Sequence, residues 1–234
     1  MEFDQAQFPI LLTMDVLVAD DLYRFYHAGD DETLALRGVS IRVARGETIA
    51  VIGPSGSGKS TLLACLAGID EPDGGTVTVM GRRMSHRPES ERSSLRAAYI
   101  GVMLQSGNLF DGLTTQQNLW LQMAIARKRD RPRAAEFIDR VGLADRSDAK
   151  IETLSGGESA RAALAVALST DPALILADEP TGEVDGATEL RLLELFRDRR
   201  ARGGAMLVVT HSQALASQAD RVLHLRDGRL VDGW

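Results

Sequence analysis

Residues 48–67 read TIAVIGPSGSGKSTLLACLA and predict a β-strand, a glycine-rich loop and an α-helix in succession. The apolar run Thr48 to Ile52 is typical of a buried strand, and Ser60 to Ala67 predicts a helix. Between them, Gly53 to Ser60 fits the spacing G-x-x-x-x-G-K-[ST]. The glycines allow backbone N–H groups to surround phosphate oxygens, and the helix start attracts the same anion. A chance glycine-rich turn is the alternative, and the flanking strand and helix argue against it.

This loop and a later acidic pair together predict a nucleoside triphosphatase of the P-loop class. Lys59 would bind the β- and γ-phosphates of ATP, and Ser60 would place its hydroxyl on Mg²⁺. Asp178 and Glu179 follow the apolar run 173–177; Asp178 would also hold Mg²⁺, and Glu179 would act as general base toward the attacking water. Acidic residues often close strands without a catalytic role, so this assignment depends on the loop. The predicted nucleotide-binding residues of the loop are Gly53, Ser55, Gly56, Gly58, Lys59, Ser60 and Thr61.

A second anion site is predicted where Leu154-Ser155-Gly156-Gly157 opens the alanine-rich helical run 158–168. A serine and two glycines at a helix start expose N–H groups at the positive end of the helix dipole. One chain with one nucleotide does not need two such sites. Our hypothesis is that Ser155 and Gly157 bind the γ-phosphate held by a second copy, so that a homodimer encloses two ATP molecules. In isolation, the tetrapeptide would be better explained as an ordinary serine N-cap.

The periodicity along the chain predicts an α/β architecture. Residues 16–26 and 36–43 resemble antiparallel strands separated by a polar turn, His27 to Glu32. Helical periodicity without strands occupies residues 114–143, with Thr114 and Asp130 as N-caps and Gly142 as a C-terminal stop. From residue 173 onward, strand-like and helical runs alternate, which favours a parallel sheet covered by helices. Further strands are expected at 76–80 and 99–104, and a helix at 88–96.

The composition is that of a folded globular protein. The chain has 234 residues, 44% of them hydrophobic and 26% charged, with a formal net charge of −6; this charge argues against nonspecific nucleic-acid binding. The single cysteine excludes an internal disulfide, and no apolar run approaches the ~18 residues of a membrane helix. Residues 1–18 are too acidic for a signal peptide. We expect a cytoplasmic protein that works at a membrane only as a peripheral subunit.

The segment Leu154 to Arg161 resembles the signature motif of ABC-transporter ATPase subunits, and other markers follow in the family's order. The resemblance implies functional roles for four further residues. Tyr26 would stack on adenine, Gln105 would sense Mg²⁺ and contact the membrane partner, Asp185 would couple the two ATP sites, and His211 would contact the γ-phosphate. It implies an ATP-hydrolysing homodimer that drives an integral membrane permease from the inner face of the cell membrane. It also implies a RecA-like core with an N-terminal antiparallel β subdomain (about 16–105 and 161–234) and an inserted α-helical subdomain (about 106–160), within one domain, 1–234.

Finer features, such as Asn108-Leu109-Phe110 and Pro180-Thr181-Gly182, resemble the lipoprotein-release and macrolide-export branch. Three departures from the family pattern are Glu158 to Ala160, Leu104, and Glu183-Val184; none removes a phosphate ligand or the general base. Residues before Met14 have no counterpart that we can name, and Met14 is an alternative start. Two other functions stay open: a soluble ABC ATPase in cell division or repair, and a regulatory module that uses ATP only to dimerise. The chain lacks the long coiled-coil insertion of repair types and retains the residues that hydrolysis requires.

Overall fold

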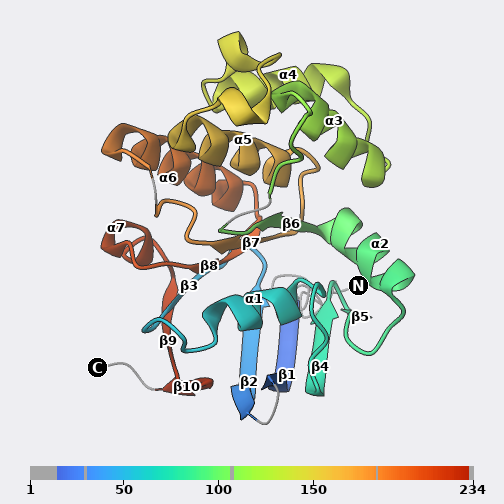
Figure 1. Ribbon diagram of the computed structural model, residues 1–234, viewed down its shortest axis with the longest axis vertical. Coiled ribbons are helices and arrows are strands. Elements are labelled where there is room, and N and C mark those ends of the chain that lie inside the picture. Colours follow the sequence, from blue (N-terminus) through green and yellow to red (C-terminus); the bar gives the residue numbers. More distant parts are fainter. Residues whose placement is uncertain (1–14, 29–30, 106–107, 183, 232–234) are drawn as a thin grey trace, which may run out of the picture.

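The computed structural model describes residues 15–28, 31–105, 108–182 and 184–231 (Figure 1). The predictions for residues 1–14 and for Glu183 therefore lie outside the described residues. The helices are α1 (Lys59–Leu66), α2 (Glu89–Tyr99), α3 (Thr115–Ile125), α4 (Arg131–Arg140), α5 (Gly156–Leu168), α6 (Gly186–Ala201) and α7 (Gln213–Ala216), with short 3₁₀ turns η2 (Ala144–Arg146) and η3 (Ile151–Thr153). In the described residues, no helix combines the length and the apolar character needed to cross a membrane.

The strands form two sheets. The first is antiparallel, in the order β2 (Asp31–Ala44), β1 (Asp15–Ala28), β4 (Gly74–Val79) and β5 (Arg82–Arg83). The second has the order β10 (Arg229–Val231), β9 (Arg221–Arg226), β3 (Thr48–Ile52), β8 (Ala205–Val209), β7 (Leu174–Asp178) and β6 (Ile100–Met103). All neighbours from β9 to β6 are parallel, and only β10 is antiparallel. Since parallel strands present their carboxyl ends at one edge, the segments after β3 and β7 meet there.

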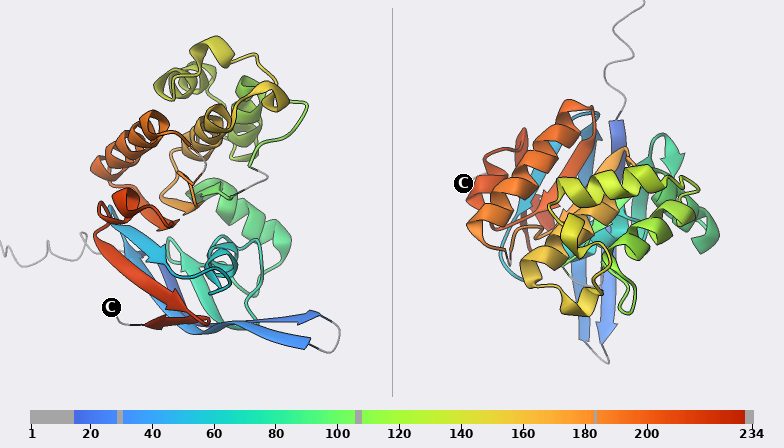
Figure 2. Two further views of the ribbon diagram at one scale, coloured as in Figure 1. Left: turned by 60° about the vertical axis from the view of Figure 1, so that its left-hand side comes forward. Right: turned by 90° about the horizontal axis from the view of Figure 1, so that it is seen from above.

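The central parallel strands β3, β7 and β8 are buried on both faces, which explains their largely apolar sequences, whereas β9 is mostly exposed or half-buried. Alternate residues of β3 serve two cores: Ile49 and Val51 pack with α1 and the antiparallel sheet, while Ala50 packs toward α5 and α6. The second core continues into α3 and α4. Figure 2 shows this helical layer at the end of the molecule opposite the β1–β2 hairpin. The predicted α/β fold, a P-loop core with an antiparallel β region and a helical insertion, is confirmed.

The caps predicted for the helical region are present. Thr114 accepts a hydrogen bond from the backbone N–H of Gln117 and forms a capping box at α3. Asp130 caps α4, and Gly142, with φ of +68°, follows the end of that helix. The subdomain boundaries near 106 and 160 stay a prediction. Helix α5 runs through the second of them, and its side chains pack in the core shared with β7.

The predicted polar turn from His27 to Glu32 is wrong in extent. The backbones of β1 and β2 stay paired through Tyr26↔Thr33, His27↔Glu32 and Ala28↔Asp31. Polar residues suggested a turn, but backbone hydrogen bonding between two strands does not require apolar side chains. The short strands β5 and β10 were not predicted, because two or three residues carry no measurable periodicity.

Candidate functional site

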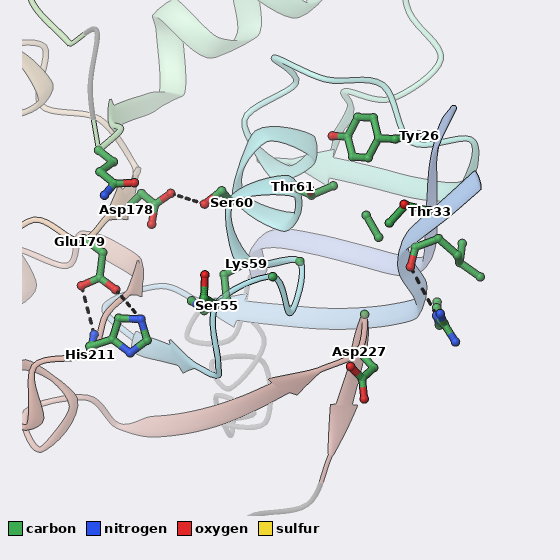
Figure 3. A pocket seen from close by; sticks show the side chains of 17 residues that line it. Tyr26, Thr33, Ser55, Lys59, Ser60, Thr61, Asp178, Glu179, His211 and Asp227 are labelled. Atoms are coloured by element: carbon green, nitrogen blue, oxygen red, sulfur yellow. Dashed lines mark hydrogen bonds and ion pairs between the residues drawn. The ribbon is translucent and has the colours of Figure 1, made fainter. Parts of the chain in front are cut away.

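A cavity of about 730 Å³ opens at the phosphate-binding loop (Figure 3). Eleven sequence-predicted residues line it: Tyr26, Ser55, Gly56, Gly58, Lys59, Ser60, Thr61, Gln105, Asp178, Glu179 and His211. They come from β1, from the loop before α1 and the first turn of α1, and from positions at or just after the ends of β6, β7 and β8. The fold thus gathers at one site residues that are separated by up to 185 positions in the chain (26 to 211).

The loop between β3 and α1 requires glycine at two positions. Gly58 has a φ of +100°, and a Cβ atom there would lie 2.4 Å from the carbonyl oxygen of Ala35. A Cβ atom at Gly53 would lie 2.1 Å from the carbonyl oxygen of Leu225. The loop is therefore pressed against β2 on one side and β9 on the other. Its backbone can approach a ligand because no side chain intervenes.

Lys59 and Ser60 occupy the first turn of α1, beside the end of β7. The Lys59 side chain is largely buried, and its Nζ donates hydrogen bonds to the carbonyl oxygens of Gly53 (2.8 Å) and Pro54 (2.9 Å). Ser60 Oγ donates to Asp178 Oδ2 at 2.7 Å. A hydroxyl and a carboxylate are hard oxygen donors of the kind that Mg²⁺ prefers, so this pair fits the ion. Mg²⁺ favours six ligands, so the remainder would come from the nucleotide, Gln105 and water.

Glu179 and His211 lie side by side on one wall of the cavity (Figure 3). The backbone N–H of His211 donates to Glu179 Oε2 at 3.1 Å, and His211 Nε2 lies 3.4 Å from Glu179 Oε1. Glu179 Oε1 is buried and has no hydrogen-bond partner in the described residues. Glu179 also has a φ of +47°, a strained conformation for a residue with a side chain. A carboxylate on a strained backbone, with one oxygen that lacks a hydrogen-bond donor, is suited to accept a proton from water.

Tyr26 and Gln105 also line the cavity. The Tyr26 side chain is 39% exposed, and its hydroxyl donates to Asp70 Oδ2 at 2.7 Å. Partial burial raises the pKa of Tyr26, and the neighbouring Asp70 carboxylate raises it as well. Gln105 is exposed after β6 and also lines a second cavity of about 600 Å³ against α5. Gln105, Glu179 and His211 thus line both cavities.

Four predicted residues, Gly53, Ser155, Gly157 and Asp185, do not line the cavity, although Asp185 lies near Gly157 at the starts of α6 and α5. Ser155 is the N-cap of α5: its Oγ accepts from the N–H of Glu158 at 3.2 Å, while Glu158 Oε2 accepts from the N–H of Ser155 at 2.8 Å. The backbone N–H of Ser155, with the Arg146 guanidinium, lowers the pKa of Glu158 to about 2. Asp185 caps α6 through the N–H groups of Ala187 and Thr188, both at 2.9 Å. The capping role of Ser155 is real, and it leaves the hydroxyl proton free to be donated.

Six cavity-lining residues were missed by sequence reasoning: Thr33, Leu34, Ala35, Arg37, Asp227 and Gly228. The backbone N–H of Arg37 donates to the carbonyl oxygen of Gly228 at 2.8 Å, and the Gly228 N–H donates to Ser57 O at 3.0 Å. These bonds tie β2 and the β9–β10 turn to the loop. The dipeptide Asp227-Gly228 is a hairpin signal that could have located the turn. No local signal placed it beside the loop between β3 and α1.

Comparison with known proteins agrees with this geometry. The sequence profile of the ABC transporter family matches residues 36–182, and the chain belongs to this family. It is an ATP-binding ATPase cassette. One of the solved structures similar to it is that of the ATP-binding cassette MJ0796, a dimer in a post-hydrolysis state bound to ADP and Pi. The TM-score is 0.88 at 30% identity, covering 92% of this chain and 97% of that one.

Among curated relatives, two lipoprotein-releasing system ATP-binding proteins named LolD align over 93% of this chain. The protein of Acinetobacter baylyi is 39% identical and covered to 97%, and that of Bordetella pertussis is 43% identical and covered to 96%. The macrolide export ATP-binding/permease protein MacB of Hyphomonas neptunium is 35% identical over 94% of this chain, which corresponds to 35% of MacB. The chain thus matches whole LolD proteins and a part of MacB.

Proposed function

We propose that this ATPase is the nucleotide-hydrolysing subunit of a membrane complex of the lipoprotein-release or macrolide-export type. It would be cytoplasmic and peripheral on the inner face of the membrane. The names of the relatives favour this branch. The structural observation that carries the proposal is the position of Gln105, which lines both the nucleotide cavity and the second cavity. A permease segment in the second cavity would therefore touch a residue that also faces the nucleotide.

The second cavity has the chemistry of a protein-docking groove. Its lining combines apolar side chains, Leu104, Leu109 and Val184, with the small residues Ser159, Ala160 and Ala163 of α5. Ser159 and Ala160 belong to the stretch that departs from the Gln-centred family pattern, and their short side chains leave room for an inserted side chain. Phe110, next to the groove, is 61% exposed, so its apolar side chain is available to a segment docked there.

In the proposed mechanism, two copies enclose two MgATP between them. Each copy contributes Ser155 and Gly157 to the γ-phosphate bound in the other, since these residues lie outside their own cavity. Mg²⁺, held by Ser60, Asp178 and Gln105, would offset the negative charge of the phosphates. Lys59 would exchange its carbonyl contacts for the β- and γ-phosphates. Glu179 would accept a proton from the attacking water, while His211 holds the Glu179 carboxylate and contacts the γ-phosphate.

The test is a pull-down of the Glu179→Gln variant from membranes with MgATP, followed by mass spectrometry. Without the general base, we expect turnover to stop and an ATP-bound dimer to persist. One integral membrane protein should be recovered at near-equal amount. Undiminished hydrolysis in this variant would remove the general-base assignment, and recovery of soluble partners alone would favour a role in cell division or repair.

A matched pair of charge reversals tests the groove. Asp111→Arg, added to Glu179→Gln, changes an exposed residue that lines the groove, and Asp145→Arg changes an exposed residue on η2 outside it. Recovery of the membrane protein should fall several-fold with the first change and not with the second, while both variants still dimerise with ATP. Equal recovery from the two would mean that the permease docks elsewhere.

A further inference from the structure

Tyr26 is held by a cluster of charged residues that the nucleotide does not need to touch. Tyr26 lines the nucleotide cavity, whereas Arg24 and Asp70 lie outside the described lining. The Arg24 guanidinium carbon lies 4.7 Å from the centroid of the Tyr26 ring. The same guanidinium donates to both carboxylate oxygens of Asp70, from Nε at 2.9 Å and from NH2 at 2.8 Å. Asp70 Oδ2 also accepts from the Tyr26 hydroxyl at 2.7 Å.

The cluster replaces backbone pairing at this part of β1. The last residue of β1 that pairs with β4 is Tyr23, opposite Gly74. Beyond it, Asp73 Oδ2 accepts from the backbone N–H of Phe25 at 2.7 Å and from Arg24 NH1 at 3.0 Å. Side chains of the segment that follows α1 therefore hold the strand where the β4 ladder has ended.

The Arg24–Asp70 ion pair in this cluster is partly buried. The side chains of Arg24 and Asp70 are 20% and 25% exposed. Although burial opposes it, hydrogen bonds from Tyr26 and Arg24 lower the pKa of Asp70. A bidentate pair of this kind is geometrically specific, because two parallel hydrogen bonds fix the guanidinium plane. A cation beside an aromatic ring is also attracted to it.

We infer that Arg24 is a positioning residue for nucleotide binding. Together with Asp70 it holds the Tyr26 ring in the orientation that receives the adenine base. This inference rests on the proposed contact between Tyr26 and adenine. A 39% exposed aromatic side chain would otherwise lose rotamer freedom each time ATP binds, and fixing it beforehand removes that cost. Because α1 begins at the phosphate-binding loop and ends just before Asp70, the cluster also connects the adenine end of the cavity to the phosphate end.

The experiment measures the Kd and KM of the full-length protein for MgATP, with inorganic tripolyphosphate as a competitor that has no base. Arg24→Gln should raise the Kd for ATP about three- to tenfold, from the loss of the cation near the ring and of the fixed geometry. The kcat and the inhibition constant of tripolyphosphate should stay within twofold. Arg24→Lys, which keeps the charge without the bidentate pair, should recover part of the loss. The control is Arg42→Gln, since Arg42 also pairs with two aspartates, Asp15 and Asp20, on the same sheet.

A double-mutant cycle with Tyr26→Ala separates positioning from a general structural effect. If Arg24 acts through the ring, Arg24→Gln will have no further effect on ATP affinity once Tyr26 is alanine. Additive losses, or equal weakening of tripolyphosphate, would overturn the inference. An unchanged Kd for ATP in Arg24→Gln, together with a raised Kd for ATP in Tyr26→Ala, would also overturn the inference. If Tyr26→Ala itself binds ATP normally, the adenine contact is wrong, and the inference falls with it while the ATPase assignment stands.

Discussion

Replacing Gly58 by alanine should destabilise the protein much more than the same change two residues earlier. Gly56 has a φ of +78° and open space around the position of a Cβ atom, so Gly56→Ala should cost only the left-handed backbone penalty, about 1–2 kcal/mol. At Gly58, with φ of +100°, the new Cβ atom would also lie 2.4 Å from the carbonyl oxygen of Ala35 in β2. Displacing that backbone adds about 1–3 kcal/mol. The expected total is roughly 2–5 kcal/mol.

The assay is urea unfolding without nucleotide, followed by circular dichroism, with thermal melting as a second measure. For a chain of this length, each 1 kcal/mol lowers the Tm by about 2–4 °C. Gly81→Ala serves as control, because Gly81 has a φ of +72° and open space but lies outside the phosphate-binding loop. Gly56→Ala and Gly81→Ala should lose similar amounts of stability. Equal losses in all three variants would refute the reasoning, since contact with β2 would then contribute nothing.

Three further predictions concern the helix caps, the signature glutamate and the cysteine. Thr114→Ala and Ser155→Ala each remove the hydroxyl of a capping box and should each cost about 1 kcal/mol of stability. Only Ser155→Ala should also lower ATP turnover, by at least tenfold. Normal turnover in Ser155→Ala would mean that Ser155 acts as a helix cap alone. Because the pKa of Glu158 is lowered from 4.5 to about 2, the stability that its charge contributes is complete above pH 4.5 and is lost as the pH falls toward 2. The stability gap between wild type and Glu158→Gln, measured by urea unfolding, should narrow over that range, and a constant gap would contradict this. Burial raises the pKa of Cys65 to about 12, so a thiol reagent should label Cys65 in denaturant but only slowly in the native protein. Labelling of the native protein at the rate of a free thiol would contradict this prediction.

Most of the candidate site could be predicted because its residues belong to local patterns. The loop before Lys59 combines glycine spacing with a strand and a helix, and Asp178 and Glu179 directly follow a buried strand. The N-caps Thr114 and Asp130 are single-residue signals whose geometry depends on the next three residues only. Tyr26 could be found from the family order, but nothing in the local sequence indicated its contact with Asp70.

The errors and omissions share a different cause. The extent of the β1–β2 hairpin depends on pairing between two backbones, which polar residues such as His27 do not prevent. The place of Asp185 as the N-cap of α6, outside the chain's own cavity, depends on where α6 packs.

The linear pattern of this chain determined its class, most of its strand and helix order and the residues predicted to contact phosphate, because each depends on spacing over a few positions. Tertiary structure alone decided that the 34–37 segment of β2 and the Asp227-Gly228 turn enclose the nucleotide cavity, and that Arg24 and Asp70 hold Tyr26. It also gave Gln105 its place in two cavities. These contacts join residues that are tens to nearly two hundred positions apart, and only packing of the two sheets around a common core brings such residues within hydrogen-bond distance.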